Sequence, residues 1–382
     1  MIEWQVLTGE YPPQPGGVSD YTRQVARGLA QAGDAVTIWA PPADGASVPD
    51  PGVAVHRLPD RFGPRSLRIL GRALDGRRTA RVLLQYVPHA FGWRAANLPF
   101  CCWLRSRPHD RLWVMFHEVA FPFERGNSAS RHALAAVNRI MASLVGRSAE
   151  RVFVSIPAWR APLSALVRHG APVEWLPVPS SIDVLTDPAG RQHVRRVHAA
   201  DRPLVGHFGT YGAAIRPAVC HALGELFARS EAQALLLGRG SEDAARAFAE
   251  RFPQFRSRVH GTGVLSDADV SRHVAACDLM LQPYPDGISS RRTSAMAVLR
   301  HGRPMVTTRG RLTESIWEQS GAVTLVDAGD PVALAQAAAA LLHDTERREH
   351  LSSLGPALYD AHFDLRHTIA VLRADSAAGV RI

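Results

Sequence analysis

Short apolar runs alternate with amphipathic stretches along the first half of the chain. The apolar runs are residues 4–8, 36–40, 82–87, 112–116 and 152–155. Runs of this length predict β-strands, and the stretches between them, such as residues 19–32, have helical spacing. Strand and helix alternate at a spacing that predicts a parallel sheet covered by helices on both faces.

The alternation stops and then starts again in the second half. Residues 173–190 are rich in proline and show no long periodic pattern, so we interpret them as an interdomain connection. The second set of predicted strands comprises residues 204–208, 234–237, 259–260, 279–281, 305–307 and 323–326. A chain of 382 residues is also too long for one ordinary core. We therefore expect an α/β protein with two Rossmann-like domains, 1–182 and 183–357, and a ligand cleft at the C-terminal ends of both sheets.

The composition is that of a globular protein, with 46% hydrophobic and 21% charged residues. No apolar run is long enough to span a bilayer, and the N-terminus lacks the basic region of a secretory signal. The four cysteines are Cys101, Cys102, Cys220 and Cys277. Their spacing fits neither a metal site nor a disulfide framework, so we expect no metal and a reduced, cytoplasmic location.

The net charge is +9, and the chain contains no lysine, so every fixed cation is arginine. This excludes catalysis through a lysine Schiff base. An anionic ligand would have to be held by Arg, His, backbone N–H groups or a metal. A GC-rich genome is the simpler explanation of the charge. Nucleic-acid binding is the alternative, but the chain shows none of the motifs of that class, and we expect no nucleic-acid partner.

One stretch combines several groups suited to an anion. In LQPYPDGISSRRTSAMAVLRHGRPMV, a predicted strand is followed by two prolines, a glycine and then a helix. Asp286, Ser289, Ser290, Arg291 and Arg292 lie at this junction. The end of a strand and the start of a helix is the usual place for an anionic ligand in an open α/β sheet.

Four further candidates follow other predicted strands. They are the Gly16–Gly17 loop, the His117–Glu118 pair, Thr210 with Arg216, and Arg239 between two glycines. Glycines let backbone N–H groups approach a phosphate, an arginine binds phosphate, and a histidine can donate to a sugar hydroxyl or transfer a proton. Each candidate alone is equally consistent with an ordinary turn or a surface residue.

Taken in order, these positions resemble the GT-B glycosyltransferases, and within them glycosyltransferase family four. The segments GEYPPQPGGVSDYT, VMFHE, VGHFGTYG, LLLGRG and GRPMVTT carry the resemblance, which covers residues 2–342. It implies two Rossmann-like domains facing each other across a central cleft. It also implies that residues 358–382 return to the first domain as a helix.

The resemblance implies a retaining transfer of a sugar from a nucleoside-diphosphate sugar to a glycan or lipid-linked acceptor. His117 and Asp286 would be catalytic. The donor would be bound mainly in the second domain, by Gly17, Thr210, Arg216, Arg239, Ser289, Ser290, Arg291 and Arg292. The acceptor would be bound mainly in the first domain, by Gly16, Tyr21 and Glu118. No metal or other cofactor is expected, because arginines, backbone N–H groups and a helix dipole would stabilise the leaving diphosphate.

The usual E-x7-E glutamate pair of this family is missing. One alignment places Ser289 and Ala297 at the two glutamate positions, and the other places Asp286 and Ser294 there. Thr210 also stands where an arginine is common. We therefore predict a site in which arginines and hydroxyls replace the glutamates. The alternative is a GT-B protein that binds nucleotide sugar or glycan but has lost catalysis.

A row of arginines in the first half of the chain is a candidate surface for binding a membrane. Arg61, Arg65, Arg68 and Arg72 fall on one face of a predicted helix, and Leu67, Leu70 and Leu74 fall on the opposite face. The arginines form either a solvated face or a surface for anionic lipid headgroups. The second reading predicts a peripheral protein of polysaccharide biosynthesis on the inner face of a membrane.

Overall fold

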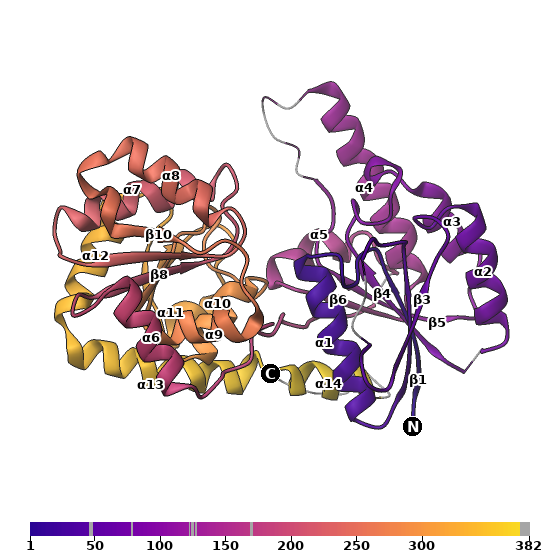
Figure 1. The fold of residues 1–382 in the computed structure, drawn as a ribbon. Coiled ribbons are helices and arrows are strands. Elements are labelled where there is room, and N and C mark those ends of the chain that lie inside the picture. Colours follow the sequence, from indigo (N-terminus) through magenta and orange to yellow (C-terminus); the bar gives the residue numbers. More distant parts are fainter. Residues whose placement is uncertain are drawn as a thin grey trace. The chain divides into compact units, whose positions relative to one another are not determined.

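The computed structural model describes residues 1–45, 49–77, 79–121, 123, 126, 128–168 and 171–374, and it divides into two compact units (Figure 1). Unit 1 comprises Met1–Val178 together with the chain from Leu365 onward, and unit 2 is Pro179–Asp364. The expected boundaries were at 182–183 and 357–358. The second boundary falls later because helix α13 (Thr345–His362) continues within unit 2.

Unit 1 contains a seven-stranded parallel sheet with the order β3-β2-β1-β4-β5-β6-β7. Its strands are β1 (Glu3–Thr8), β2 (Ala35–Ala40), β3 (Val53–Arg57), β4 (Arg81–Tyr86), β5 (Arg111–Phe116), β6 (Arg151–Val154) and β7 (Val173–Trp175). The five predicted strands are present. The edge strands β3 and β7 were not predicted, and β7 lies inside the segment interpreted as an interdomain connection.

Helices cover both faces of this sheet, as predicted. They are α1 (Gly17–Gln31), α2 (Pro64–Asp75), α3 (Leu98–Arg105), α4 (Ala129–Ser148), α5 (Arg160–Ser164) and α14 (Leu365–Arg373), with short 3-10 turns at Trp93–Ala95 and Pro157–Trp159. Within β1, Leu7 packs into the core on the side of α2, α3 and α4, whereas Trp4 and Val6 pack into the core with α1 and α14. This alternation follows from the two-residue period of a strand.

The C-terminal helix α14 returns to unit 1, as expected, and lies beside α1 (Figure 1). A Cβ at Gly28 of α1 would lie 2.8 Å from Ile369 Cδ1, so the missing side chain permits the close approach. The guanidinium of Arg81 donates to the carbonyl oxygen of Leu372 at 2.8 Å, and Arg151 donates to that of Val371 at 3.1 Å. Strands β4 and β6 thereby hold the last turn of α14.

Unit 2 contains a six-stranded parallel sheet with the order β10-β9-β8-β11-β12-β13. The strands are β8 (Leu204–Phe208), β9 (Gln233–Leu237), β10 (Val259–Gly261), β11 (Leu279–Gln282), β12 (Met305–Arg309) and β13 (Thr324–Asp327). The helices are α6 (Pro188–His198), α7 (Ile215–Phe227), α8 (Ser241–Arg251), α9 (Asp267–Ala276), α10 (Thr293–Arg300), α11 (Ser315–Gln319), α12 (Pro331–His343) and α13, with a 3-10 turn at Pro253–Arg258. All six strands were predicted.

Because the strands of each sheet are parallel, their C-terminal ends share one edge, which we call the carboxyl edge, and their starts share the amino edge. In unit 2 the chain proceeds outward from β8 through β9 to β10, and then returns to the other side of β8 as β11. The switch between β8 and β11 is where open α/β sheets bind ligands, at the carboxyl edge.

Candidate functional site

The loops after β8 and β9 are in backbone contact at the carboxyl edge of the second sheet. A Cβ at Gly238 would fall against the carbonyl oxygen of Gly209, and Gly238 has φ +105°. A side chain is therefore excluded at Gly238 both by space and by conformation. The two loops present main chain, rather than side chains, at the switch point.

Two buried polar groups lie at the ends of the strands that flank this switch. His207 Nδ1 lies 2.8 Å from the carbonyl oxygen of Leu281, so Nδ1 carries the proton. Burial lowers the pKa of His207 to about 4, and the ring is neutral at physiological pH. His207 Nε2 and Gln282 Oε1 are buried acceptors that have no hydrogen-bond partner in the described part of the chain. Buried acceptors without a protein partner are rare, and these two are available to a water or a ligand.

The half-buried carboxylate of Glu314 fixes the loop between β11 and α10. Glu314 Oε1 accepts from the backbone N–H of Ser290 at 3.0 Å and from Ser290 Oγ at 2.6 Å, and Glu314 Oε2 accepts from Trp317 Nε1 at 2.7 Å. Burial raises the pKa of Glu314 above its usual range, and these donors act against that rise. Ser290 is thus engaged in positioning the loop. The neighbouring Ser289 Oγ is buried without a partner among the described residues.

The two predicted arginines lie half-buried at the start of α10. The guanidinium of Arg292 lies 4.8 Å from the centre of the Tyr284 ring, and the hydroxyl of Tyr284 lies 2.9 Å from Ser294 Oγ. No described carboxylate forms an ion pair with Arg292, and its buried Nε has no hydrogen-bond partner. A guanidinium that rests on an aromatic face keeps its N–H donors available for an anion.

The remaining unit 2 candidates are on the loops of the same edge. Asp286 forms an ion pair with Arg311 at 2.8 Å through Oδ1. Thr210 and Arg239 are exposed on the loops after β8 and β9, and Arg216 is exposed in the first turn of α7. These candidates therefore share one edge of one sheet.

Several residues of this edge were missed from the sequence. They are His207, Gln282, Tyr284 and Glu314. His207 and Gln282 stand inside apolar strands, where a polar residue is unusual, and this was a usable signal. Glu314 directly precedes a helix that follows a strand, which is the position used to select the other candidates.

At the carboxyl edge of the first sheet, His117 follows β5 and is nearly fully buried. Its Nε2 lies 2.8 Å from Gln85 Oε1, and its ring meets the ring of Tyr21 edge-on at 4.9 Å. Burial lowers the pKa of His117 to about 3, so the ring is neutral and a weak base. Nδ1 forms no hydrogen bond with a described residue, so it is the ring atom available to a ligand.

Two of the other unit 1 candidates, Gly16 and Glu118, lie near Glu10, a carboxylate that was not predicted. A Cβ at Gly16 would lie 2.5 Å from Glu10 Oε2, whereas a Cβ at Gly17 would meet nothing within 4 Å. The ring of His89 lies 3.9 Å from the carboxylates of both Glu10 and Glu118. Burial raises the pKa of Glu10, and His89 opposes that rise. Glu10 and His89 therefore belong to the same cluster as Gly16 and Glu118.

Within the described residues, no group of three or more His, Cys, Asp or Glu side chains is arranged to hold a metal ion. No helix in the described part of the chain is both long and apolar enough to cross a membrane. The groups at the carboxyl edge of the second sheet are mainly arginines, hydroxyls, a neutral histidine and backbone N–H donors, and those of the first sheet include a neutral histidine and the carboxylates of Glu10 and Glu118. This set can bind anions and sugar hydroxyls.

Two protein-family models match the chain. Residues 16–169 match a glycosyl transferase 4-like domain, and residues 204–344 match the glycosyl transferases of group 1. No curated protein sequence matches the chain.

Solved structures with the same fold cover 97% of the chain. Sucrose-phosphate synthase from Thermosynechococcus elongatus is 18% identical, with 97% of that chain covered and a TM-score of 0.72. HepE from Anabaena, in complex with UDP and glucose, is 16% identical, with 98% covered and a TM-score of 0.71. WaaG, a glycosyltransferase involved in lipopolysaccharide biosynthesis, is 16% identical, with 100% covered and a TM-score of 0.70. The two domain matches and the shared fold confirm the resemblance, and the chain belongs to the GT-B glycosyltransferases of the family-four type.

Proposed function

We propose that the protein transfers a sugar from a nucleoside-diphosphate sugar to a hydroxyl group of a glycan or lipid-linked acceptor, with retention of the anomeric configuration. The observation that carries the donor assignment is Arg292, a half-buried cation that rests on Tyr284 and has no carboxylate partner among the described residues. It stands at the switch point of the second sheet, and its backbone N–H donates to the carbonyl oxygen of Ser289 at 3.0 Å. An arginine in this setting is suited to a diphosphate.

The diphosphate in this proposal lies across the start of α10 and the loop of Gly209. Arg291 and Arg292 donate to its oxygens, and the positive end of the α10 dipole adds to their field. The glycine loops supply backbone N–H donors at close range. HepE has been solved with UDP and with UDP-glucose, which supports a donor of this class.

The chemistry follows from where charge develops. The bond between the anomeric carbon and the diphosphate oxygen breaks, and negative charge grows on the diphosphate. The acceptor oxygen forms the new bond to the anomeric carbon on the same face, and its proton passes to the departing diphosphate. Arg291 and Arg292 stabilise this charge more strongly in the transition state than in the intact donor, which lowers the barrier. His117, being neutral, serves as a hydrogen-bond partner of a sugar hydroxyl rather than as a proton carrier. Asp286 orients the transferred sugar from the loop after β11.

The acceptor side of the proposal rests on unit 1. Gly16 and Glu118 lie in one cluster with Glu10 and His89, and this cluster offers carboxylates to hydroxyl groups. Carboxylates accept hydrogen bonds from sugar hydroxyls, and their negative charge disfavours an anionic acceptor substrate at that position. A glycan or a lipid-linked sugar fits this chemistry.

A panel of UDP-, GDP- and ADP-sugars, offered with glycan and lipid-linked acceptors, tests the proposal. Calorimetry gives the nucleotide preference, and NMR coupling constants give the anomeric configuration of the product. We expect one nucleotide family to bind and a product of retained configuration. An inverted product would refute retention, and nucleotide binding without transfer to any acceptor would favour the non-catalytic alternative.

A further inference from the structure

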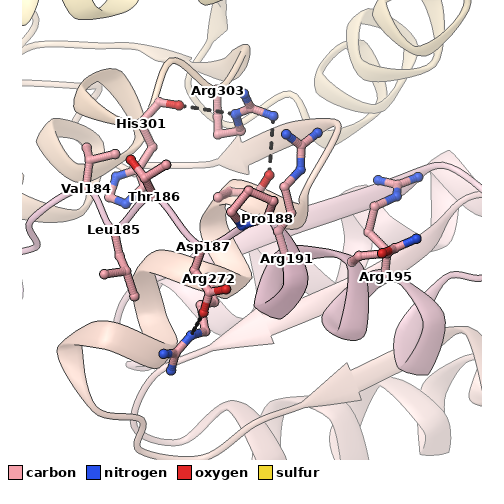
Figure 2. A pocket seen from close by; sticks show the side chains of 12 residues that line it. Val184, Leu185, Thr186, Asp187, Pro188, Arg191, Arg195, Arg272, His301 and Arg303 are labelled. Carbon is pink, nitrogen blue, oxygen red and sulfur yellow. Dashed lines mark hydrogen bonds and ion pairs between the residues drawn. The ribbon is translucent and has the colours of Figure 1, made fainter.

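A pocket of about 550 Å³ lies at the amino edge of the second sheet, the edge opposite the proposed donor loops. Residues 184–188, helix α6, helix α9 and the segment that leads into β12 form its walls (Figure 2). All of these belong to unit 2. Nothing in the proposed transfer reaction uses this pocket.

Four arginines line the pocket, and carboxylates neutralise two of them. Arg272 forms ion pairs with Asp187 and Asp269, each at 2.7 Å. Arg195 forms an ion pair with Asp278 at 3.0 Å. These two guanidinium groups are accounted for within the protein.

The other two, Arg191 and Arg303, have no ion pair with a carboxylate in the described chain. Arg303 donates to backbone carbonyl oxygens, at 3.2 Å to His301 and at 3.4 Å to Ala275 and Cys277. Figure 2 shows the guanidinium of Arg191 beside that of Arg303. Two like charges therefore face one pocket.

The repulsion between the two guanidinium groups affects the pKa of Arg303. Burial lowers its pKa first, and the neighbouring charge of Arg191 lowers it further. Asp278 acts in the opposite direction but is ion-paired with Arg195. An anion placed between Arg191 and Arg303 would remove the repulsion and would meet N–H donors on both sides.

The other walls indicate what such an anion would carry. His301 adds no charge, because it is bonded to Ser271 Oγ and the Ala297 carbonyl and burial lowers its pKa. Val184, Leu185 and Pro188 contribute apolar surface. The volume is within the range of pockets for small organic molecules, and it is far larger than one phosphate needs.

We propose that this pocket is a second binding site, which takes a small phosphorylated molecule and holds its phosphoryl group between Arg191 and Arg303. The planar guanidinium group matches two phosphate oxygens at once, which favours a phosphoryl group over a monovalent anion. The apolar residues receive the rest of the molecule. The inference is independent of the proposed transfer reaction.

Calorimetry on the full-length protein, with glucose 6-phosphate, inorganic phosphate and glucose as probes, tests the site. Arg191 is exposed, so Arg191→Gln should fold normally. We expect this variant to weaken the binding of both phosphorylated probes at least tenfold, and we expect glucose not to bind. Arg196→Gln, an exposed change on the same helix α6 outside the pocket, is the matched control and should bind as the wild type does.

A donor-edge variant, Arg291→Ala with Arg292→Ala, separates the two sites. We expect it to retain the binding of glucose 6-phosphate. Loss of that binding in the donor-edge variant, unchanged binding in Arg191→Gln, equal loss in Arg196→Gln, or no phosphate-dependent binding by the wild type would each overturn the second site.

Discussion

Arg292 and Arg309 differ in what their guanidinium groups contact. Arg309 ends β12 and forms ion pairs with Asp327 at 2.6 Å and Glu318 at 3.3 Å. Arg292 instead rests on the ring of Tyr284. In a chain rich in arginine, the group that each guanidinium contacts therefore says more about its role than its position in the sequence does. The sequence could place Arg292 at a strand–helix junction, but it could not show that no described carboxylate forms an ion pair with Arg292.

Replacing Arg291 and Arg292 together with alanine should weaken the binding of the preferred nucleoside diphosphate at least tenfold. Each lost hydrogen bond to a charged oxygen is worth about 1.5–3 kcal/mol. Calorimetry with the free nucleotide measures this directly. Arg246→Ala removes an exposed arginine of α8 and is the control. Wild-type affinity in a folded double variant would show that this loop does not bind the diphosphate.

His117→Ala should lower turnover at least tenfold and leave the affinity for nucleoside diphosphate nearly unchanged. The reason is that His117 belongs to unit 1, whereas the proposed diphosphate site belongs to unit 2. Because its pKa is about 3 in the folded protein, its ionisation should not appear in the pH–rate profile between pH 5 and 8. Steady-state kinetics and calorimetry together check both statements. Full activity in His117→Ala and in Asp286→Ala would show that neither residue contacts the sugar.

Acid should destabilise the protein through its buried histidines. His207 has a pKa of about 4 when folded and near 6.5 when unfolded, so the unfolded chain binds more protons between these values. Its contribution to stability is thus complete above about pH 6.5 and is lost as the pH falls towards 4. The loss is on the order of 2 kcal/mol at pH 5.

Urea unfolding at pH 7.5 and pH 5 measures this loss. The difference in unfolding free energy between the two pH values should shrink in His207→Gln and stay unchanged in His343→Gln, a histidine exposed at the end of α12. The comparison with wild type removes the opposite contribution of Glu314, whose raised pKa stabilises the folded state at low pH and is lost as pH rises. An identical pH dependence in His207→Gln and wild type would contradict the assignment.

At the scale of elements, continuous apolar runs predicted the central strands and missed the edges. Every residue of β4 is buried, whereas β3 alternates between half-buried and exposed positions and β7 is half-buried throughout. An edge strand covered on one side needs no apolar run, so its sequence resembles a connection. For this reason residues 173–175 were grouped with the connection that follows.

The candidate site shows the same limit. The sequence located the loop of Ser289, Ser290, Arg291 and Arg292, since the strand and the helix around it have clear patterns. It did not reveal that Ser290 binds Glu314 of the next loop, because that contact joins positions 24 residues apart through the path of two loops. Pairing of this kind depends on strand order rather than on local pattern.

The arginines on and before helix α2 allow a test of whether the protein binds an anionic membrane surface, where a lipid-linked acceptor would be found. Arg65, Arg68 and Arg72 are exposed on α2, and Leu70 and Leu74 are buried, as the pattern predicted. The prediction was wrong for Arg61, which is exposed but precedes the helix, because α2 begins only at Pro64. Near anionic lipid each arginine adds about 1 kcal/mol, enough for reversible attachment. We expect the protein to sediment with anionic vesicles at low salt and to be released at high salt, and neutral vesicles to capture little.

Changing these four arginines to glutamine should abolish the capture and leave unfolding unchanged. The charge-matched control changes four exposed arginines of unit 2, namely Arg196, Arg246, Arg256 and Arg347. Equal loss in the control would show that only net charge matters. If vesicles capture the first variant as well as the wild type, the four arginines on and before α2 form a solvated surface and do not bind lipid.

At the scale of the whole molecule, several arginines bond to the protein's own backbone. Arg81 and Arg151 hold the last turn of α14, and Arg258 donates to backbone carbonyl oxygens of Phe227 and Ala232. Guanidinium groups used in this way offer little to a nucleic acid. The net charge of +9 is therefore a weak indicator of partners, and the matches of both halves to glycosyltransferase domains agree with that view.

The return of α14 to unit 1 has a consequence for the order in which the protein is made. Synthesis proceeds from the N-terminus, and domains generally fold as they emerge from the ribosome. Unit 1 emerges first, but Val371 and Leu372 of its core are added only after the whole of unit 2. Until they arrive, Gly28 and its neighbours on α1 lack their covering helix. Unit 2, a single uninterrupted segment, can finish folding while the nascent unit 1 still waits for its final helix.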